Sequence, residues 1–83
     1  MTFSIFWQSQ ARKFLRKLPS EVSKRIVKKI KEIKENPFRY LEHFEGNGYK
    51  FRIGDYRLII DVDQNNKILK IRVLDKRSRI YKR

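Results

Sequence analysis

Hydrophobic and polar residues alternate along residues 2–8, where Phe3, Ile5 and Trp7 fall on one side of an extended chain. A two-residue period that includes aromatic side chains is typical of a β-strand with one buried face. We therefore expect the chain to begin with a strand over residues 2–8.

The period then changes to that of a helix in two consecutive segments. In the first, Ser9 is a candidate N-cap and the helix ends at Leu18, because Pro19 disfavours helical geometry in the residue before it. In the second, Ser20 is the candidate N-cap and the helix stops near Asn36. A turn this short predicts an antiparallel helical hairpin. Its hydrophobic stripes are Ala11, Phe14, Leu15 and Leu18, then Val22, Ile26, Ile30 and Ile33.

Residues 37–49 combine turn-forming Pro, Gly and Asn with several large hydrophobic side chains. We expect a loop that packs back onto the core. Its one histidine, His43, is expected to be a packing or surface residue and not a catalyst. The hydrophobic residues of this loop are Phe38, Tyr40, Leu41 and Phe44.

The rest of the chain alternates strand and turn, with two-residue hairpin turns expected at residues 54–55 and 65–66. The first turn places Arg52 opposite Arg57. The predicted fold class is therefore α+β: an N-terminal strand, the helical hairpin, and a three-strand antiparallel meander with the helices on one face. Both turns place the same hydrophobic residues on that face, namely Phe51, Leu58, Ile60, Val62, Leu69, Ile71 and Val73.

The opposite sheet face collects positive charge. Asp61 lies across from Lys70 and accounts for that cation. Arg52 and Arg57 face each other with no carboxylate evident nearby, and like charges in that position destabilise a sheet. We interpret the face as an anion-binding surface. Its cations are Lys50, Arg52, Arg57, Lys70 and Arg72.

Composition agrees with an anionic partner. The 83 residues suit one domain over residues 1–83, and 22 Lys and Arg against 9 Asp and Glu leave a net charge of +13. Such an excess indicates nucleic acid as the partner. No apolar stretch approaches a membrane span, so we expect no membrane contact. The absence of Cys leads us to expect a cytoplasmic location. With no Cys and a single His, we expect no metal or other cofactor.

A polybasic segment follows the last predicted strand, where five of the nine residues 75–83 are Lys or Arg. The register sets Lys76 opposite Asp55, so this segment begins beside Arg52 and Arg57. Guanidinium groups next to one aromatic ring, Tyr81, suit a phosphate and its unstacked base.

Three motifs in this order carry a family resemblance: YKFRI at residues 49–53, GDYRLII at residues 54–60 and KRSR at residues 76–79, with Tyr81 close behind. The chain resembles the RelE/ParE toxin superfamily, and within it the archaeal and bacterial RelE branch, over nearly its whole length. The resemblance implies a type II toxin that cleaves mRNA in the ribosomal decoding site and is neutralised by a RelB-like antitoxin in a hetero-oligomer.

The resemblance also implies the site residues. Catalytic positions of RelE-like enzymes correspond here to Lys50, Arg52, Arg57, Arg77 and Tyr81. The sequence departs from some relatives in having Arg52 where they have Lys, and in a shorter spacing from Arg77 to Tyr81. The expected RNA-binding residues are Lys70, Arg72, Lys76 and Arg79.

RNA cleavage by internal transfer requires a base for the 2′-hydroxyl, stabilisation of the charged phosphorane and an acid for the departing 5′-oxygen. Lys50 is the candidate base, because neighbouring cations favour loss of its proton. Arg57 and Arg77 would clamp the phosphate, and Tyr81 would stack on or orient a base. The acid stays open among Arg77, Arg52 and Tyr81.

Two other functions remain open. A ParE-like toxin shares the fold but inhibits DNA gyrase, and such relatives generally lack the full set of basic residues and Tyr. A non-catalytic nucleic-acid-binding module would need only the net charge. New cuts within translated codons would distinguish the ribonuclease from both.

Overall fold

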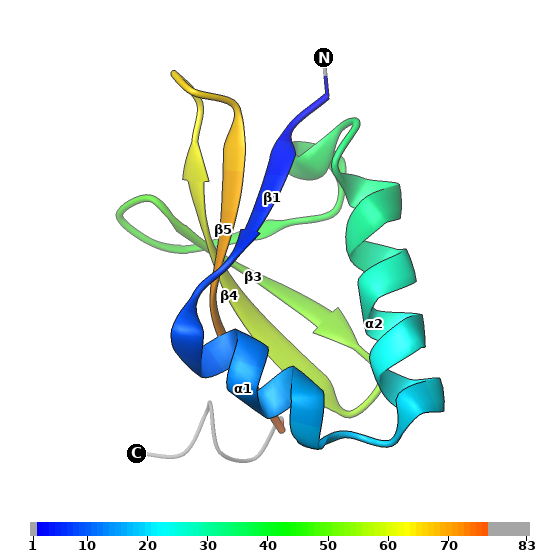
Figure 1. The fold of residues 1–83 in the computed structure, drawn as a ribbon. Helices are drawn as coiled ribbons and strands as arrows, with labels where there is room; N and C mark the ends of the chain where they lie inside the picture. Colours follow the sequence, from blue (N-terminus) through cyan, green and yellow to red (C-terminus); the bar gives the residue numbers. More distant parts are fainter. Residues whose placement is uncertain (1, 77–83) are drawn as a thin grey trace.

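The computed structural model describes residues 2–76, which form five strands, two α-helices and one turn of 3₁₀-helix (Figure 1). No helix in this part of the chain is long and apolar enough to cross a membrane. The elements are β1 (Ser4–Trp7), α1 (Ser9–Lys17), α2 (Ser20–Ile33), η1 (Pro37–Arg39), β2 (Glu42–Glu45), β3 (Gly48–Ile53), β4 (Tyr56–Asp63) and β5 (Ile68–Lys76).

The strands form one sheet in the order β1-β5-β4-β3-β2. β1 runs parallel to β5, and the other neighbours are antiparallel. The predicted α+β class, with helices against one face of the sheet, is confirmed. The prediction of a loop over residues 37–49 is wrong, because this segment contains η1 and β2, and the antiparallel meander has four strands. The Gly and Asn residues that indicated a loop form the tip of a β2–β3 hairpin, in which Gly46 has a φ of +54°.

The β3–β4 register is the one predicted, with Arg52 opposite Arg57 and Phe51 opposite Leu58. The β4–β5 register agrees with the predicted one only from Asp63 to Ile60. The turn between these strands is the four-residue segment 64–67 and not the predicted two-residue turn. A β-bulge follows Ile60 and makes Arg72 an extra residue on β5.

The bulge shifts the side-chain alternation of β5 by one residue. Leu74, and not Val73, therefore lies opposite Leu58 and is fully buried. Lys76 lies opposite Tyr56 instead of Asp55. Two regular hairpin turns could not reveal this shift, because a bulge changes the register without leaving a turn signal.

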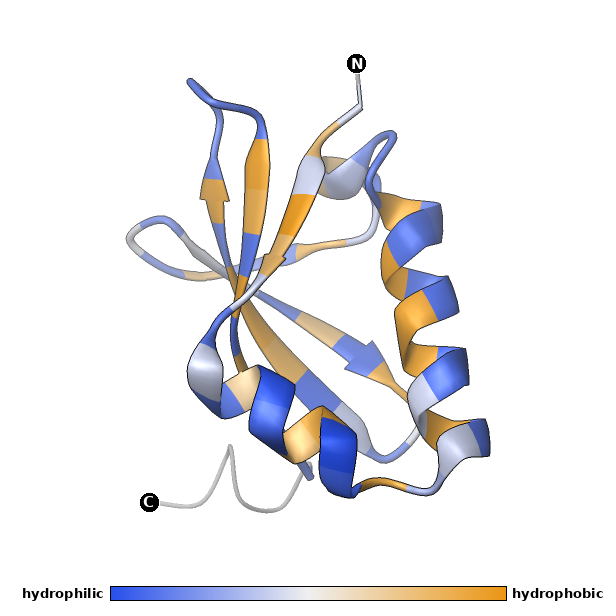
Figure 2. Cartoon of the chain, viewed as in Figure 1, coloured by the Kyte–Doolittle hydropathy of each residue, from blue (hydrophilic) through white to orange (hydrophobic). Residues whose placement is uncertain are grey.

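Both helices pack on the sheet face that the hydrophobic residues define (Figure 2). Figure 1 shows α1 near the end of the sheet opposite to the β4–β5 turn, with α2 alongside the sheet. Gln10 joins α1 to β5: its Nε2 donates to the Leu74 carbonyl at 3.3 Å, and its Oε1 accepts from the Leu74 N–H at 3.1 Å. The fully buried side chains of the core include Ile26, Ile30, Ile33, Leu58, Ile60, Leu69, Ile71 and Leu74.

The helix boundaries agree with the sequence pattern, but the predicted caps do not. The N-cap positions are Gln8 and Pro19, and neither has a capping side-chain hydrogen bond. Ser9 and Ser20 are instead the first helical residues. Pro19 ends α1 and starts α2, so the connection between the helices is as short as predicted.

Candidate functional site

Three predicted site residues lie together on the sheet face opposite to the helices. Lys50 and Arg52 are on β3, and Arg57 is on β4 directly across from Arg52. Their side chains share this face because residues two apart on a strand point the same way. They line one hollow of about 480 Å³ with Tyr40, Glu42 and Phe51.

The three cations differ in exposure. Arg57 is only 6% exposed, Lys50 is half-buried and Arg52 is exposed. Burying a guanidinium costs free energy unless acceptors or opposite charges surround it. The residue across from Arg57 on β5 is Asp75, which corrects the expectation that no carboxylate lies near this pair. A guanidinium that lines an open hollow is suited to bind an oxyanion.

Glu42 and Tyr40 are site residues that the sequence analysis missed. Glu42 lies across from Lys50 in the β2–β3 ladder, and half-exposed Tyr40 lies just before β2. Glu42 is therefore a second candidate for the general base, beside Lys50. The missed signal was the Gly46-Asn47 pair, which is typical of a hairpin and would have placed a strand beside β3.

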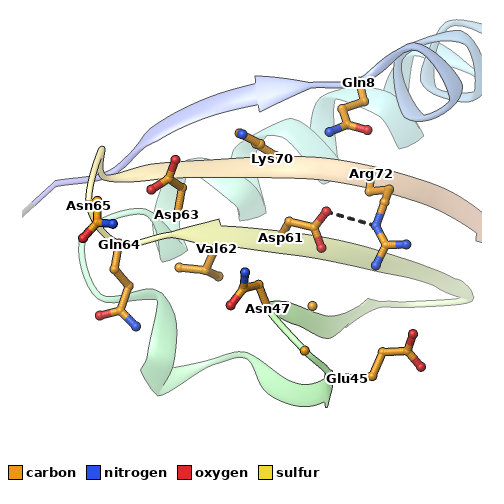
Figure 3. A pocket seen from close by; sticks show the side chains of 12 residues that line it. Gln8, Glu45, Asn47, Asp61, Val62, Asp63, Gln64, Asn65, Lys70 and Arg72 are labelled. Carbon is orange, nitrogen blue, oxygen red and sulfur yellow. Dashed lines mark ion pairs between the residues drawn. The ribbon is translucent and has the colours of Figure 1, made fainter.

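The RNA-binding residues predicted on β5 lie further along the same face. We expected Asp61 to form an ion pair with Lys70. Its ion pair is instead with Arg72, whose Nε lies 3.1 Å from Asp61 Oδ2. Lys70 is across from Asp61, as predicted. Figure 3 shows Lys70, Arg72 and Asp61 at a second hollow. Its lining residues are all different from those of the hollow around Lys50.

Of the remaining predicted site residues, one lies within the described residues and three do not. Lys76 is the last residue of β5 and is exposed. Arg77, Arg79 and Tyr81 lie outside the described residues, so the structure places only part of the predicted catalytic set.

His43 has a packing role, as expected. Its ring lies 5.4 Å from that of Tyr49, and its Nε2 is 3.0 Å from the Gly46 carbonyl within the β2–β3 hairpin. Within residues 2–76, no three His, Cys, Asp or Glu side chains are grouped as ligands of a metal ion.

A third hollow, of about 450 Å³, lies between α1 and α2. Leu15 and Val27 supply its apolar surface, and both are only half-buried. Its other lining residues are mostly basic, namely Arg16, Lys24, Lys28 and Lys31, with Ser23. We call this feature the helix groove.

The fold is that of the RelE toxins. The RelBE2 toxin–antitoxin complex of Mycobacterium tuberculosis contains a chain with a TM-score of 0.83 and 22% identity, covering 93% of this chain and 100% of that one. For the archaeal RelE–RelB complex of Pyrococcus horikoshii, the TM-score is 0.78 and the identity 28%, and the match covers 95% of this chain and 99% of that one. For the isolated RelE toxin of Escherichia coli, the TM-score is 0.76 and the identity 26%, and the match covers 95% of this chain and 90% of that one.

Family membership follows from the sequence as well. The model of the ParE toxin of type II toxin–antitoxin systems matches residues 5–81. No curated protein sequence matches the chain significantly. The chain therefore belongs to the ParE toxin family, within the RelE/ParE superfamily, and is a toxin of a type II toxin–antitoxin system.

Proposed function

We propose that this toxin is a ribosome-dependent mRNA endonuclease that arrests translation in the cytoplasm. The observation that carries the proposal is the convergence of Lys50, Arg52 and Arg57 in one hollow. Like charges brought this close destabilise the sheet, and a bound phosphate offsets that repulsion.

The reaction that fits this hollow is internal transfer. A 2′-oxygen attacks the adjacent phosphorus, the bond to the 5′-oxygen breaks, and a 2′,3′-cyclic phosphate and a free 5′-hydroxyl result. Arg57 and Arg52 would stabilise the charge that develops on the phosphate oxygens. The proton of the 2′-hydroxyl would pass to Glu42 or Lys50, which are neighbours on β2 and β3.

The general acid must protonate the 5′-oxygen. We retain Arg77 and Tyr81 as candidates together with Arg52. Tyr40 lines the hollow and presents an exposed ring, so it adds a second aromatic surface on which an unstacked base can lie.

A second function, inhibition of DNA gyrase, is favoured by the matching family model, whose description is that of a ParE toxin. Gyrase inhibition needs no phosphate-cleaving constellation. The clustering of Lys50, Arg52 and Arg57 beside a carboxylate is therefore the reason to prefer the endonuclease.

The test is primer extension on mRNA from cells that express the chain, together with purified toxin and programmed ribosomes. We expect new 5′ ends within translated codons, and no change in DNA supercoiling. Arg52→Ala and Arg57→Lys should each lower cleavage by at least about tenfold, since such donors contribute about 10²–10³ in rate.

The matched control is Arg12→Ala, which removes an exposed arginine from α1 and should retain wild-type cleavage. Circular dichroism checks that each variant is folded. Loss of supercoiling without mRNA cuts would identify a gyrase inhibitor instead.

We propose that the helix groove receives the cognate RelB-like antitoxin in a hetero-oligomer. Its half-buried Leu15 and Val27, bordered by Arg16, Lys24 and Lys28, fit an amphipathic segment with acidic flanks. Two of the similar structures described above, those from Mycobacterium tuberculosis and Pyrococcus horikoshii, are toxin–antitoxin complexes, which supports a partner of this kind.

A further inference from the structure

A second hollow of about 830 Å³ lies on the sheet face that carries Lys50, Arg52 and Arg57, nearer to the β4–β5 turn (Figure 3). Its volume is in the range of small-ligand sites. We call it the turn-side hollow. The side chains that define its chemistry come from the end of β2, the β2–β3 turn, β4 and β5, and are Glu45, Asn47, Asp61, Asp63, Lys70 and Arg72.

An ion pair forms part of the wall of this hollow. Arg72 Nε lies 3.1 Å from Asp61 Oδ2, with 42% and 33% of the two side chains exposed. A pair this exposed contributes little to stability. It does, however, hold guanidinium donors and carboxylate oxygens side by side in the hollow.

Gly48 keeps the hollow open beside this pair. Its backbone does not have the positive φ that would require glycine, so the reason for glycine here is space. A Cβ at this position would lie 3.1 Å from Arg72 Nη2, 3.4 Å from Asp61 Oδ1 and 3.0 Å from the Glu45 carbonyl. A side chain here would therefore crowd Arg72 Nη2 and the Glu45 backbone carbonyl, and would only touch Asp61.

The charge of the turn-side hollow argues against a second phosphate site. Three carboxylates, Glu45, Asp61 and Asp63, line it against two cations, Lys70 and Arg72. The hollow around Lys50 has the reverse balance, with one carboxylate and three cations. A phosphate is favoured only in the latter, whereas a neutral group with both donors and acceptors suits the former.

Amide side chains at the rim supply further donors and acceptors. The backbone carbonyl of Asn47 accepts from the Val62 N–H at 3.1 Å, which ties the β2–β3 turn to β4 and leaves the Asn47 side-chain amide out of this bond. Carboxylate, guanidinium and amide groups are the side chains that read nucleobase edges by hydrogen bonding. The amide-bearing residues that line the hollow are Gln8, Asn47, Gln64 and Asn65.

The two hollows are spaced for one nucleic-acid strand. Arg57 and Asp61 are four residues apart on β4, a distance of about 13 Å at roughly 3.3 Å per residue. That equals about four nucleotides of stacked strand, at roughly 3.4 Å each, and fewer of an extended one.

We propose that the turn-side hollow is a nucleobase-binding subsite, which reads one base of the RNA strand whose phosphate lies at Lys50, Arg52 and Arg57. The Asp61–Arg72 pair supplies the hydrogen-bonding edge, and Gly48 makes room for it. This inference rests on the proposed RNA cleavage at the first hollow.

The test maps cleavage in programmed ribosomes on mRNAs whose codons are randomised, for wild type, Asp61→Asn and Arg72→Gln. In both variants the base preference at one position near the cut should fall by at least about fivefold, as expected for losing one good base contact. Gly48→Ala, which adds a methyl group 3.1 Å from Arg72 Nη2 without changing a charge, should reduce the same preference. Controls are Glu21→Gln and Arg12→Gln, on exposed positions of α2 and α1.

A binding measurement keeps the two proposals separable. A short RNA with 2′-deoxyribose at the cut site and one photoreactive base should cross-link to residues 61–72 of the wild type, and not of Gly48→Ala. Normal cutting with unchanged base preference and cross-linking in all three variants would overturn the subsite alone. Absence of cutting by the wild type would overturn the proposed function. Absence of the cross-link in the wild type would overturn the subsite. Loss of antitoxin binding in these variants, with unchanged base preference, would assign the hollow to a protein partner.

Discussion

Arg52 on β3 and Arg57 on β4 lie directly opposite each other in adjacent antiparallel strands. Arg57 is almost fully buried and Arg52 is exposed, so the inner guanidinium is held by the sheet and the outer one faces solvent. A pair of like charges at this position lowers stability, and an arrangement that lowers stability is expected where function requires it.

Replacing Arg52 by Thr should stabilise the protein while removing activity. Thr favours strands, and the change ends the repulsion with Arg57, so the free energy of unfolding should rise by roughly 0.2–1 kcal/mol. Urea unfolding measures the gain, which should shrink as salt screens the charges. Arg12→Ala controls for the loss of one positive charge from a chain of net charge +13. An Arg52→Thr variant less stable than wild type would contradict the repulsion.

The pH dependence of cleavage should identify the proton acceptor. A carboxylate base is ordinarily ionised above about pH 4–5, whereas an amine base becomes active only as the pH rises toward about 10. We expect single-turnover cleavage to be nearly level between about pH 6 and pH 8, with Glu42→Gln losing activity throughout. A rate that climbs steadily over this range, and that Lys50→Gln abolishes, would assign the base to Lys50.

The helix groove should be required for neutralisation but not for toxicity. Val27→Asp places a negative charge where the groove is apolar and should weaken antitoxin binding by about 2–4 kcal/mol, as for an interface hot spot. Calorimetry with the purified antitoxin measures the loss, and growth arrest by the variant shows that the toxin is active. Lys13→Asp, on an exposed position of α1 outside the groove, serves as the control. Unchanged affinity of Val27→Asp would place the antitoxin elsewhere.

The β4–β5 turn should weaken in acid. Asp63 Oδ2 accepts from Asn66 Nδ2 at 2.9 Å and its Oδ1 from the Asn66 N–H at 3.1 Å, and these bonds lower the pKa of Asp63 below 3.8. A carboxyl whose pKa is lowered by folding stabilises the protein fully above its unfolded value, and this contribution is lost as the pH falls through the folded value. Asp63→Asn should therefore flatten the pH dependence of stability below about pH 5, measured by thermal unfolding. The same slope in wild type and variant would show that Asp63 plays no part.

Local pattern was enough to predict most elements and one complete register. The helix stripes predicted Ile26, Ile30 and Ile33 as core, and all three are buried. Gly54 at the β3–β4 turn defined the pairing of Arg52 with Arg57, because a two-residue hairpin leaves no freedom in register.

The candidate site was predicted only in part, for an identifiable reason. Lys50, Arg52 and Arg57 lie on strands joined by a tight turn, so their spacing in the sequence was sufficient to predict that they lie together on one face. Glu42 reaches the same hollow through the β2–β3 ladder, which the sequence analysis had treated as a loop.

The sequence by itself determined the α+β class, the helical hairpin with its hydrophobic stripes, and the basic sheet face, since each depends on residue types repeating at short spacing. Only the tertiary structure decided the parallel pairing of β1 with β5, the bulge that pairs Arg72 with Asp61, and the place of Glu42 beside Lys50. Two parallel strands far apart in the sequence have no connecting turn that would indicate their pairing. The bulge shifts the register within β5 so that Leu74 is buried, and it leaves no turn signal in the sequence.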